Sequence, residues 1–290
     1  MIAITGATGQ LGTLVVEGLL HKVPANQIIA VVRTPAKARR FAEKGVQIRE
    51  ADYSVPHSLD AAFAGVAKVL LISGNEIGQR VSQHKAVIDA AKAAGVHLLA
   101  YTSLLRADTS KLLLAAEHLA TEQYLRASGI AFILLRNGWY WENLTAGIAT
   151  ALERGSFIGA SKDGRFAAAL RAEYAEAAVA VLTGQNHENK VYELAGDSAF
   201  TRTDLAAEVS RQAERTTTYR DLPESEYERI LASFLPPELA RVLADADRQS
   251  IEGAIDDHTH TLSTLIGHKT KPLAQVVADA LKVLKSLRHP

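Results

Sequence analysis

The chain has 290 residues, of which 48% are hydrophobic, and it carries 32 lysines and arginines against 32 aspartates and glutamates. This length suffices for one large domain, or for one domain with a smaller lobe, and the balanced charge argues against nucleic acid as a partner. The sequence contains no cysteine, which excludes disulfides, thiolate catalysis and cysteine metal sites, and fits a reducing compartment such as the cytoplasm.

The first twenty residues combine an apolar strand at residues 2–4, three glycines spaced G-x-x-G-x-x-G, and an amphipathic helix from about Gln10. Strand, glycine turn and helix in this order are typical of a dinucleotide site. Gly6, Gly9 and Gly12 let the backbone approach a pyrophosphate closely, and the helix N-terminus offers N–H groups and the positive end of its dipole. The alternative is a tight turn that binds no ligand.

Apolar strands continue to alternate with helical patterns as far as residue 138. Further strands are expected at residues 28–32, 46–49, 68–72, 98–101 and 130–135, and further helices at residues 34–44, 58–63, 80–94 and 112–127. This alternation predicts an α/β fold with a doubly wound parallel sheet. In such sheets ligands bind beyond the carboxyl ends of the strands.

The alternation fades after Trp139. A helix is expected at residues 172–182, a strand at residues 190–194, a helix capped by Thr201 and Asp204, and a last helix at residues 273–287. We therefore expect a nucleotide-binding domain over residues 1–138. Residues 139–290 should form a smaller α/β lobe that covers the substrate, with some segments returning to the first sheet.

No targeting or membrane segment is expected. An apolar strand that begins at residue 2 leaves no room for a signal peptide, and no apolar run reaches the ~20 residues that cross a membrane. The prediction is a cytoplasmic protein without membrane association. The sequence leaves the oligomeric state open.

The end of the second strand indicates which nucleotide binds. An acidic residue at this position accepts from the ribose 2′-hydroxyl of NAD, whereas an arginine pairs with the 2′-phosphate of NADP. This chain has Arg33 there, with three further basic residues shortly after it. Because a guanidinium matches a phosphate with paired donors, we expect NADPH, although a surface arginine is the alternative. After the third strand, Asp52 and Tyr53 are candidates to hold the adenine.

The acid–base pair of ordinary short-chain dehydrogenases is absent. None of the eight tyrosines is followed four residues later by a lysine. This argues against an alcohol dehydrogenase or an epimerase. Hydride transfer to an acceptor that needs no strong acid remains possible, and a quinone is such an acceptor.

Motifs along nearly the whole chain together resemble one family. They are ITGATGQLG at 4–12, Arg33, Asp52-Tyr53, LLISG at 70–74, AYTS at 100–103, LLRNGWYWEN at 134–143, GDSAFT at 196–201 and LIGH at 265–268. The sequence is similar to the NmrA-like family of atypical short-chain dehydrogenases/reductases. Within that family it most resembles the bacterial NADPH:quinone oxidoreductases of type 2, with triphenylmethane reductases as near relatives.

The resemblance implies a Rossmann fold and a flavin-free reductase that transfers hydride from NADPH to quinones. Two alternatives stay open, namely a non-catalytic NADP(H)-binding redox sensor of the NmrA type and a triphenylmethane-dye or azo reductase. The residues expected to contact the nucleotide are Gly6, Thr8, Gly9, Gln10, Leu11, Gly12, Arg33, Asp52, Tyr53, Ile72, Ser73, Gly74, Asn75, Tyr101, Thr102, Asn137, Gly138, Trp139, Tyr140, Trp141 and Glu142.

Two of these residues are also expected to act on the acceptor. The Asn137 amide and the Tyr140 hydroxyl are candidate donors to a quinone oxygen as charge builds on it. At least one of the rings of Trp139, Tyr140 and Trp141 should border the nicotinamide and cover a flat acceptor. The alternative for these rings is that they fill a core.

Other polar groups of the sequence favour no further chemistry. Asp256, Asp257, His258 and His260 are close in sequence, but we expect no metal site there. His118 and Glu122 stand four residues apart on a helix and are expected to pair with each other or with solvent. Ser103 lacks the G-x-S-x-G turn of a hydrolase.

Overall fold

The computed structural model describes residues 1–288, which form two compact units. The first unit comprises Met1–Asp108, Ala115–Asn137 and Arg171–Glu193. The second comprises Thr109–Leu114, Gly138–Leu170 and the chain from Leu194 onward. Within residues 1–288 no helix is long and apolar enough to cross a membrane.

The first unit is built on a seven-stranded sheet with the order β3-β2-β1-β4-β5-β6-β8. Parallel register links the first six strands. The seventh, β8, is also parallel, because the Asn189 amide donates to Phe132 near the start of β6 and Leu194 accepts from Gly138 after its end. The strands are β1 (Ile2–Thr5), β2 (Ile28–Val32), β3 (Gln47–Glu50), β4 (Lys68–Leu71), β5 (Leu98–Leu104), β6 (Ala131–Asn137) and β8 (Lys190–Leu194).

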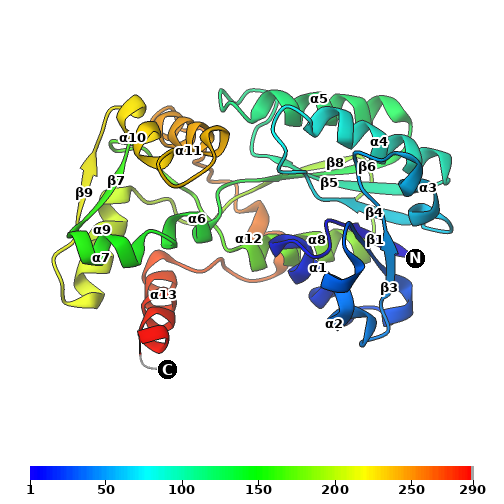
Figure 1. Cartoon of the computed structure of the whole chain (residues 1–290), viewed down its shortest axis with the longest axis horizontal. Helices are drawn as coiled ribbons and strands as arrows, with labels where there is room; N and C mark the ends of the chain where they lie inside the picture. Colours follow the sequence, from blue (N-terminus) through cyan, green and yellow to red (C-terminus); the bar gives the residue numbers. More distant parts are fainter. Residues whose placement is uncertain (289–290) are drawn as a thin grey trace. The chain divides into compact units, whose positions relative to one another are not determined.

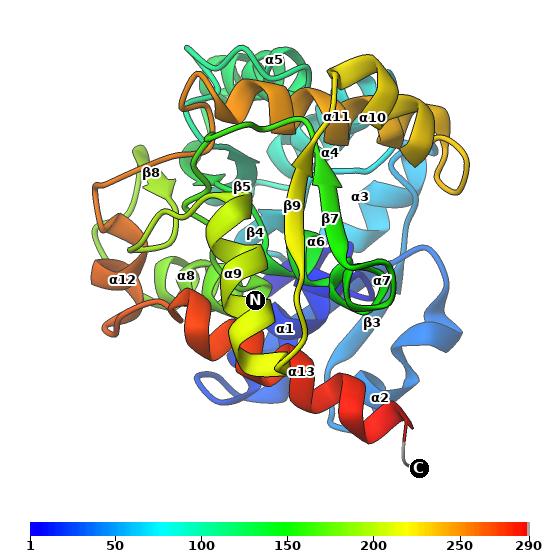
Figure 2. The same cartoon turned by 90° about the vertical axis from the view of Figure 1, so that its left-hand side faces the viewer.

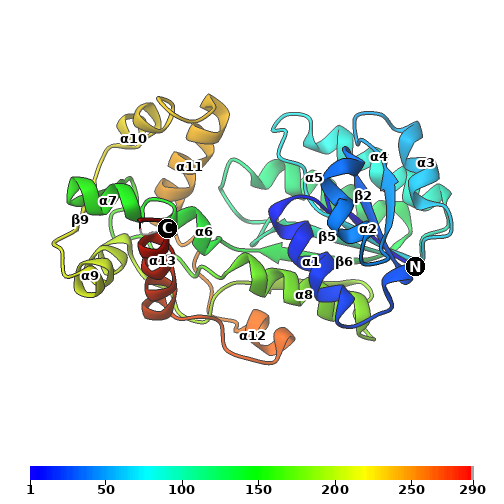
Figure 3. The ribbon, with the colours of Figure 1, turned by 60° about the horizontal axis from the view of Figure 1, so that its bottom comes forward.

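Helices cover both faces of this sheet, as Figures 1 and 3 show. On one face, α1 (Gln10–Leu20) packs against α8 (Arg171–Thr183). On the other face, α3 (His57–Phe63), α4 (Arg80–Ala93) and α5 (Ala115–Ser128) lie side by side. The central strands are buried along their whole length, which explains their continuous apolar runs. The expected doubly wound parallel sheet is confirmed.

Several element boundaries differ from the expected ones. Strands β5 and β6 each continue beyond their apolar runs, through Leu104 and Asn137. The side chains of Thr102, Ser103 and Arg136 in these extensions are buried and hydrogen-bonded, which the apolar pattern does not indicate. The expected helix at residues 34–44 is instead a 3₁₀ turn (Pro35–Ala38) followed by the short helix α2 (Arg39–Ala42).

The second unit contains a pair of short parallel strands, β7 (Ser156–Gly159) and β9 (Thr218–Asp221), which lie side by side in Figure 2. Neither strand was expected, because each has only four residues and β9 is mostly exposed. The capping box of Thr201 and Asp204 is confirmed at the start of α9. The helices of this unit are α6 (Trp141–Thr145), α7 (Ile148–Arg154), α9 (Arg202–Ala213), α10 (Glu224–Leu231), α11 (Pro237–Ser250), α12 (Thr261–Ile266) and α13 (Leu273–Arg288).

Candidate nucleotide site

Two of the three glycines after β1 are required by the backbone itself. Gly6 has a φ of 59°, in the left-handed region that glycine adopts without strain. A Cβ on Gly12 would lie 2.3 Å from the Gly6 carbonyl oxygen and 2.8 Å from the Ala7 Cα. Helix α1 can therefore approach the loop this closely only because residue 12 has no side chain.

The third glycine leaves the start of α1 open. Gly9 is the N-cap residue, is exposed, and provides no side-chain cap, and the first turn of α1 contains no acidic residue. A Cβ on Gly9 would meet only the Gly6 carbonyl oxygen, at 3.2 Å. Uncapped amides and the positive end of the helix dipole favour an anion at this position. Leu11 has a buried side chain, so only its main chain is available to a ligand.

Arg33 follows β2 directly, and its contact with a 2′-phosphate stays a prediction. Its side chain is 63% exposed and forms an ion pair with Glu76 at 3.2 Å. Two neighbouring basic residues are engaged elsewhere, since Arg39 pairs with Glu43 and Arg40 donates to the Thr13 hydroxyl.

The segment after β4 is held from within by side chains of three different elements. The Ile72 amide donates to Thr5 Oγ1 at 3.1 Å, the Ser73 amide to Thr102 Oγ1 at 2.9 Å, and the Gly74 amide to His84 Nε2 at 2.9 Å. Thr5, Thr102 and His84 are all buried. Residues 72–74 of the predicted nucleotide-contacting segment are therefore held in position by the core of the first unit.

His84 is neutral and has a defined tautomer. Its Nε2 accepts from Gly74, so the ring proton is on Nδ1, which lies 3.0 Å from Thr121 Oγ1. Burial and the positive charge of Arg80 lower the pKa of His84 from 6.5 to about 3. Arg80 also donates through Nε to the Gly74 carbonyl oxygen at 2.8 Å. Sequence reasoning missed both residues, although their i, i+4 spacing at the start of a helix places them on one face.

Tyr53 and Asp52 make contacts within the first unit. The Tyr53 hydroxyl lies against Thr5 Oγ1 and 3.1 Å from the Ile72 carbonyl oxygen, and burial of this hydroxyl raises its pKa. An Asp52 oxygen accepts from the Ser54 amide at 2.8 Å. The hydroxyl thus ties β1 to the segment after β4, and contact of the Tyr53 ring with adenine stays a prediction.

The expected pairing of His118 with Glu122 is wrong. His118 Nδ1 lies 2.7 Å from the Tyr101 hydroxyl, while Glu122 accepts from the Ser103 hydroxyl and binds Arg136 at 2.6 Å. Each residue has a partner on a neighbouring strand, because helix α5 packs onto β5 and β6. The Tyr101 side chain is fully buried, so its predicted nucleotide contact can involve only its main chain.

Arg136 is the centre of a buried network in the first unit. It binds Glu122 as described, Glu193 at 2.8 Å and Asp108 at 3.0 Å. Burial alone disfavours the charged guanidinium, but the hydrogen bonds to Glu122 and Glu193 raise the pKa of Arg136 above its usual range. The Ser103 hydroxyl donates to Glu122, so its side chain is part of this network.

The aromatic segment after β6 divides at the boundary between the units. Asn137 ends β6 in the first unit and is 5% exposed, and its carbonyl oxygen accepts from Leu105. Trp139, Tyr140 and Trp141 belong to the second unit. Trp141 stacks on Phe200 with ring centroids 4.2 Å apart, so it fills the core of that unit. Roles of Trp139, Tyr140 and the neighbouring Gly138 and Glu142 toward a ligand stay predictions.

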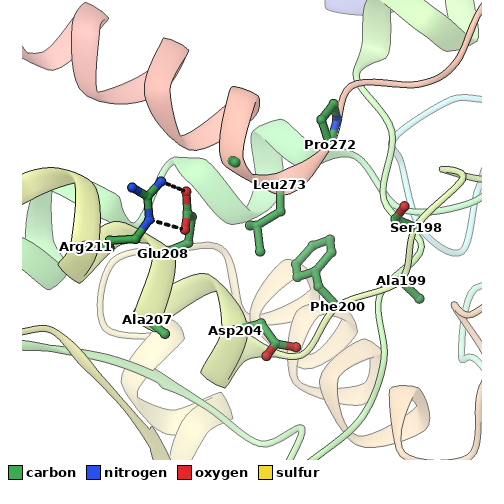
Figure 4. A pocket seen from close by; sticks show the side chains of 10 residues that line it. Ser198, Ala199, Phe200, Asp204, Ala207, Glu208, Arg211, Pro272 and Leu273 are labelled. Atoms are coloured by element: carbon green, nitrogen blue, oxygen red, sulfur yellow. Dashed lines mark hydrogen bonds and ion pairs between the residues drawn. The ribbon is translucent and has the colours of Figure 1, made fainter.

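The acidic and histidine-rich loop of the second unit forms pairwise contacts. His260 lies 3.0 Å from Asp197, and His258 lies 3.4 Å from Asp256. Among the described residues, no group of three or more histidines, aspartates and glutamates is placed to hold a metal. A pocket beside Phe200 and Leu273, where Arg211 pairs with Glu208, contains none of the predicted site residues (Figure 4).

Comparison with known proteins agrees with this architecture. A model of the NmrA-like family matches residues 1–273. Quinone oxidoreductase 2 of Escherichia coli strain K12 is 54% identical over 284 residues, covering 98% of this chain and 99% of the relative. An NAD(P)H azoreductase of Xenophilus azovorans is 31% identical over 248 residues, covering 85% of this chain and 84% of the relative.

Solved structures extend the likeness to three dimensions. The NADPH-dependent quinone oxidoreductase from Escherichia coli complexed with NADPH has a TM-score of 0.95 at 54% identity, covering 97% of this chain and all of that one. The Citrobacter sp. triphenylmethane reductase complexed with NADP(H) has a TM-score of 0.93 at 38% identity, with 97% and 100% coverage. On its sequence and its fold, the chain belongs to the NmrA-like family.

Proposed function

We propose that this chain is a flavin-free reductase that uses NADPH to reduce quinones. The observation that carries the proposal is the start of the first unit, where an uncapped helix N-terminus follows a glycine loop that excludes a Cβ at residue 12. Arg33 at the end of the neighbouring strand β2 adds the charge that a 2′-phosphate needs. The 54% identity to a protein named quinone oxidoreductase 2 supports the acceptor.

The residues of the first unit fit NADPH. The amides that follow Gly9 suit the pyrophosphate, and the planar guanidinium of Arg33 suits the 2′-phosphate. NADPH supplies the hydride when it is bound. Residues 72–74, held by Thr5, Thr102 and His84, would contact the nucleotide from a position that the core already defines. The Asn137 amide would donate to the acceptor oxygen as negative charge develops there.

A second candidate is a reductase of triphenylmethane or azo dyes. It is favoured by the 31% identity to an NAD(P)H azoreductase and the 38% identity to a triphenylmethane reductase. The regulatory alternative has weaker support, since NmrA itself shares only 16% identity at a TM-score of 0.78, which is a likeness of fold. The balanced charge and the absence of cysteine lead us to include a cytoplasmic location and no nucleic-acid partner in the proposal.

Steady-state oxidation of NADPH separates these functions. We expect turnover with simple quinones at a higher kcat/KM than with triphenylmethane or azo dyes. Tight NADPH binding without turnover on any acceptor would instead support the regulator. Faster turnover of a dye than of every quinone would make the dye reductase the better assignment.

A further inference from the structure

We propose that Glu76 reduces the preference for NADPH over NADH by competing with the 2′-phosphate for Arg33. This inference rests on the proposed use of NADPH. Glu76 Oε1 lies 3.2 Å from Arg33 Nη1, so a carboxylate already neutralises the guanidinium on which the preference depends. An acidic residue ordinarily selects NAD and a basic residue NADP. Here one residue of each kind is present in the same site, and the two pair with each other.

A second hydrogen bond, from Gln83, restricts the position of the Glu76 side chain. Its second oxygen, Oε2, accepts from Gln83 Nε2 at 2.7 Å. Gln83 is only 6% exposed, and its Nε2 also donates to the Ser54 hydroxyl at 3.0 Å. A surface carboxylate usually contributes little because both partners lose side-chain freedom on pairing. Here a buried amide has already restricted Glu76, so less freedom remains to be lost.

The strand order places this ion pair over the glycine loop. Strand β1 lies between β2 and β4 in the sheet. Arg33 follows β2, and Glu76 is in the segment after β4. Their contact therefore spans the carboxyl end of β1, where the loop that begins at Gly6 leaves the sheet. In the proposed complex the nucleotide crosses the same edge.

The two nucleotides meet Glu76 differently. A 2′-phosphate on Arg33 must displace the carboxylate or lie beside it, and the two negative charges repel each other. The 2′-hydroxyl of NADH carries no charge and can donate to a carboxylate. Glu76 therefore weakens NADPH binding and favours NADH binding, so that the preference for NADPH is smaller than Arg33 alone would give.

The test replaces Glu76 by glutamine, which keeps the side-chain shape and the hydrogen bond from Gln83. Dissociation constants for NADPH and NADH are measured by fluorescence titration without any acceptor. Glu76→Gln should tighten NADPH by about three- to tenfold and weaken NADH by about two- to fivefold. The control is Glu43→Gln, which removes the same charge from an exposed pair with Arg39 and should change neither constant.

A double variant links the effect to Arg33. In Arg33→Ala, the further change Glu76→Gln should tighten NADPH by a smaller factor than it does in the wild type, because no guanidinium is released and only the direct repulsion of the phosphate is removed. If the wild type binds neither nucleotide, the proposed function fails and the inference fails with it. If the wild type binds NADPH but Glu76→Gln matches the Glu43→Gln control, only the role of Glu76 is refuted. An equal effect of Glu76→Gln with and without Arg33 also refutes it.

Discussion

His84 Nε2 accepts a hydrogen bond from the Gly74 amide at 2.9 Å, and this contact joins helix α4 to the segment that follows β4. Only the neutral imidazole can accept through Nε2 while donating through Nδ1. The position of the predicted nucleotide segment is therefore coupled to the protonation state of one buried ring.

Protein stability should fall as the pH is lowered from about 6.5 toward 3. Burial and Arg80 lower the pKa of His84 to about 3 in the folded chain, whereas an exposed imidazole titrates near 6.5. Between these values the unfolded chain binds a proton that the folded chain does not, which adds about 1.4 kcal/mol of destabilisation per pH unit for this one group.

Urea unfolding at several pH values between 7 and 4 measures this slope. The pKa of His118 is also lowered well below 6.5, by burial and by Arg80, so the wild type should take up more than one proton. His84→Gln should reduce the slope of the unfolding free energy against pH by about 1.4 kcal/mol per pH unit, which corresponds to one proton, whatever its effect on stability at pH 7. An unchanged slope would contradict a neutral His84 in the folded state.

Arg33→Ala should weaken NADPH binding by about tenfold to a hundredfold, because a charge-assisted contact is worth ~1.5–3 kcal/mol. NADH binding should hardly change, since NADH has no 2′-phosphate. Titration of both nucleotides checks this prediction. An equal loss for both would mean that Arg33 supports the structure of the site rather than the phosphate.

Two glycine variants should separate folding from binding. Gly12→Ala places a Cβ 2.3 Å from the Gly6 carbonyl oxygen, so α1 or the loop must move and the melting temperature should fall. The Cβ of Gly9→Val would meet only the Gly6 carbonyl oxygen, at 3.2 Å, so the chain should still fold but lose NADPH, because the side chain occupies the space of the phosphate. A folded Gly9→Val variant that binds NADPH normally would contradict the pyrophosphate position.

Arg136→Met should lower the free energy of unfolding by about 3–5 kcal/mol, because it leaves the buried carboxylate of Glu122 without its partner. Glu122→Gln should cost less, since Arg136 keeps Glu193 and Asp108 and Ser103 keeps an oxygen acceptor. Chemical denaturation of the two variants gives the comparison. A larger loss in Glu122→Gln would mean that Arg136 is not the centre of the network.

Asn137→Ala should lower kcat/KM for quinones while the NADPH dissociation constant stays within a few-fold. The reason is that its proposed amide donor acts on charge that develops during the reaction. We expect the same of Tyr140→Phe. Loss of NADPH affinity with unchanged turnover at saturation would assign both residues to the nucleotide alone.

The regular part of the fold could be predicted because its signals are local. Strands such as β2 are buried on both faces and read as unbroken apolar runs, and the glycine loop has a spacing that few other structures require. Strands β7 and β9 could not be predicted, since four residues with mixed exposure carry no clear period.

Some residues of the candidate site could likewise be predicted from the sequence, and others could not. Gly6, Gly12 and Arg33 are recognised from their neighbours in sequence. Glu76 is not, because its partner Arg33 is 43 residues away and the two meet only through the strand order. The burial of Thr102 and Arg136 likewise depends on partners from distant elements. Because both residues are polar, the sequence pattern predicts that the strands end before them, whereas β5 and β6 continue through them.

The discontinuity of the first unit has a consequence for synthesis of the chain on the ribosome. Its last strand, β8, and the helix α8 that covers α1 come from Arg171–Glu193, after residues of the second unit have already been made. An emerging fragment that ends near residue 138 would expose β6 as a free edge and the apolar face of α1 to water. The first unit therefore cannot finish folding until Arg171–Glu193 has been synthesised, which happens after part of the second unit has been translated.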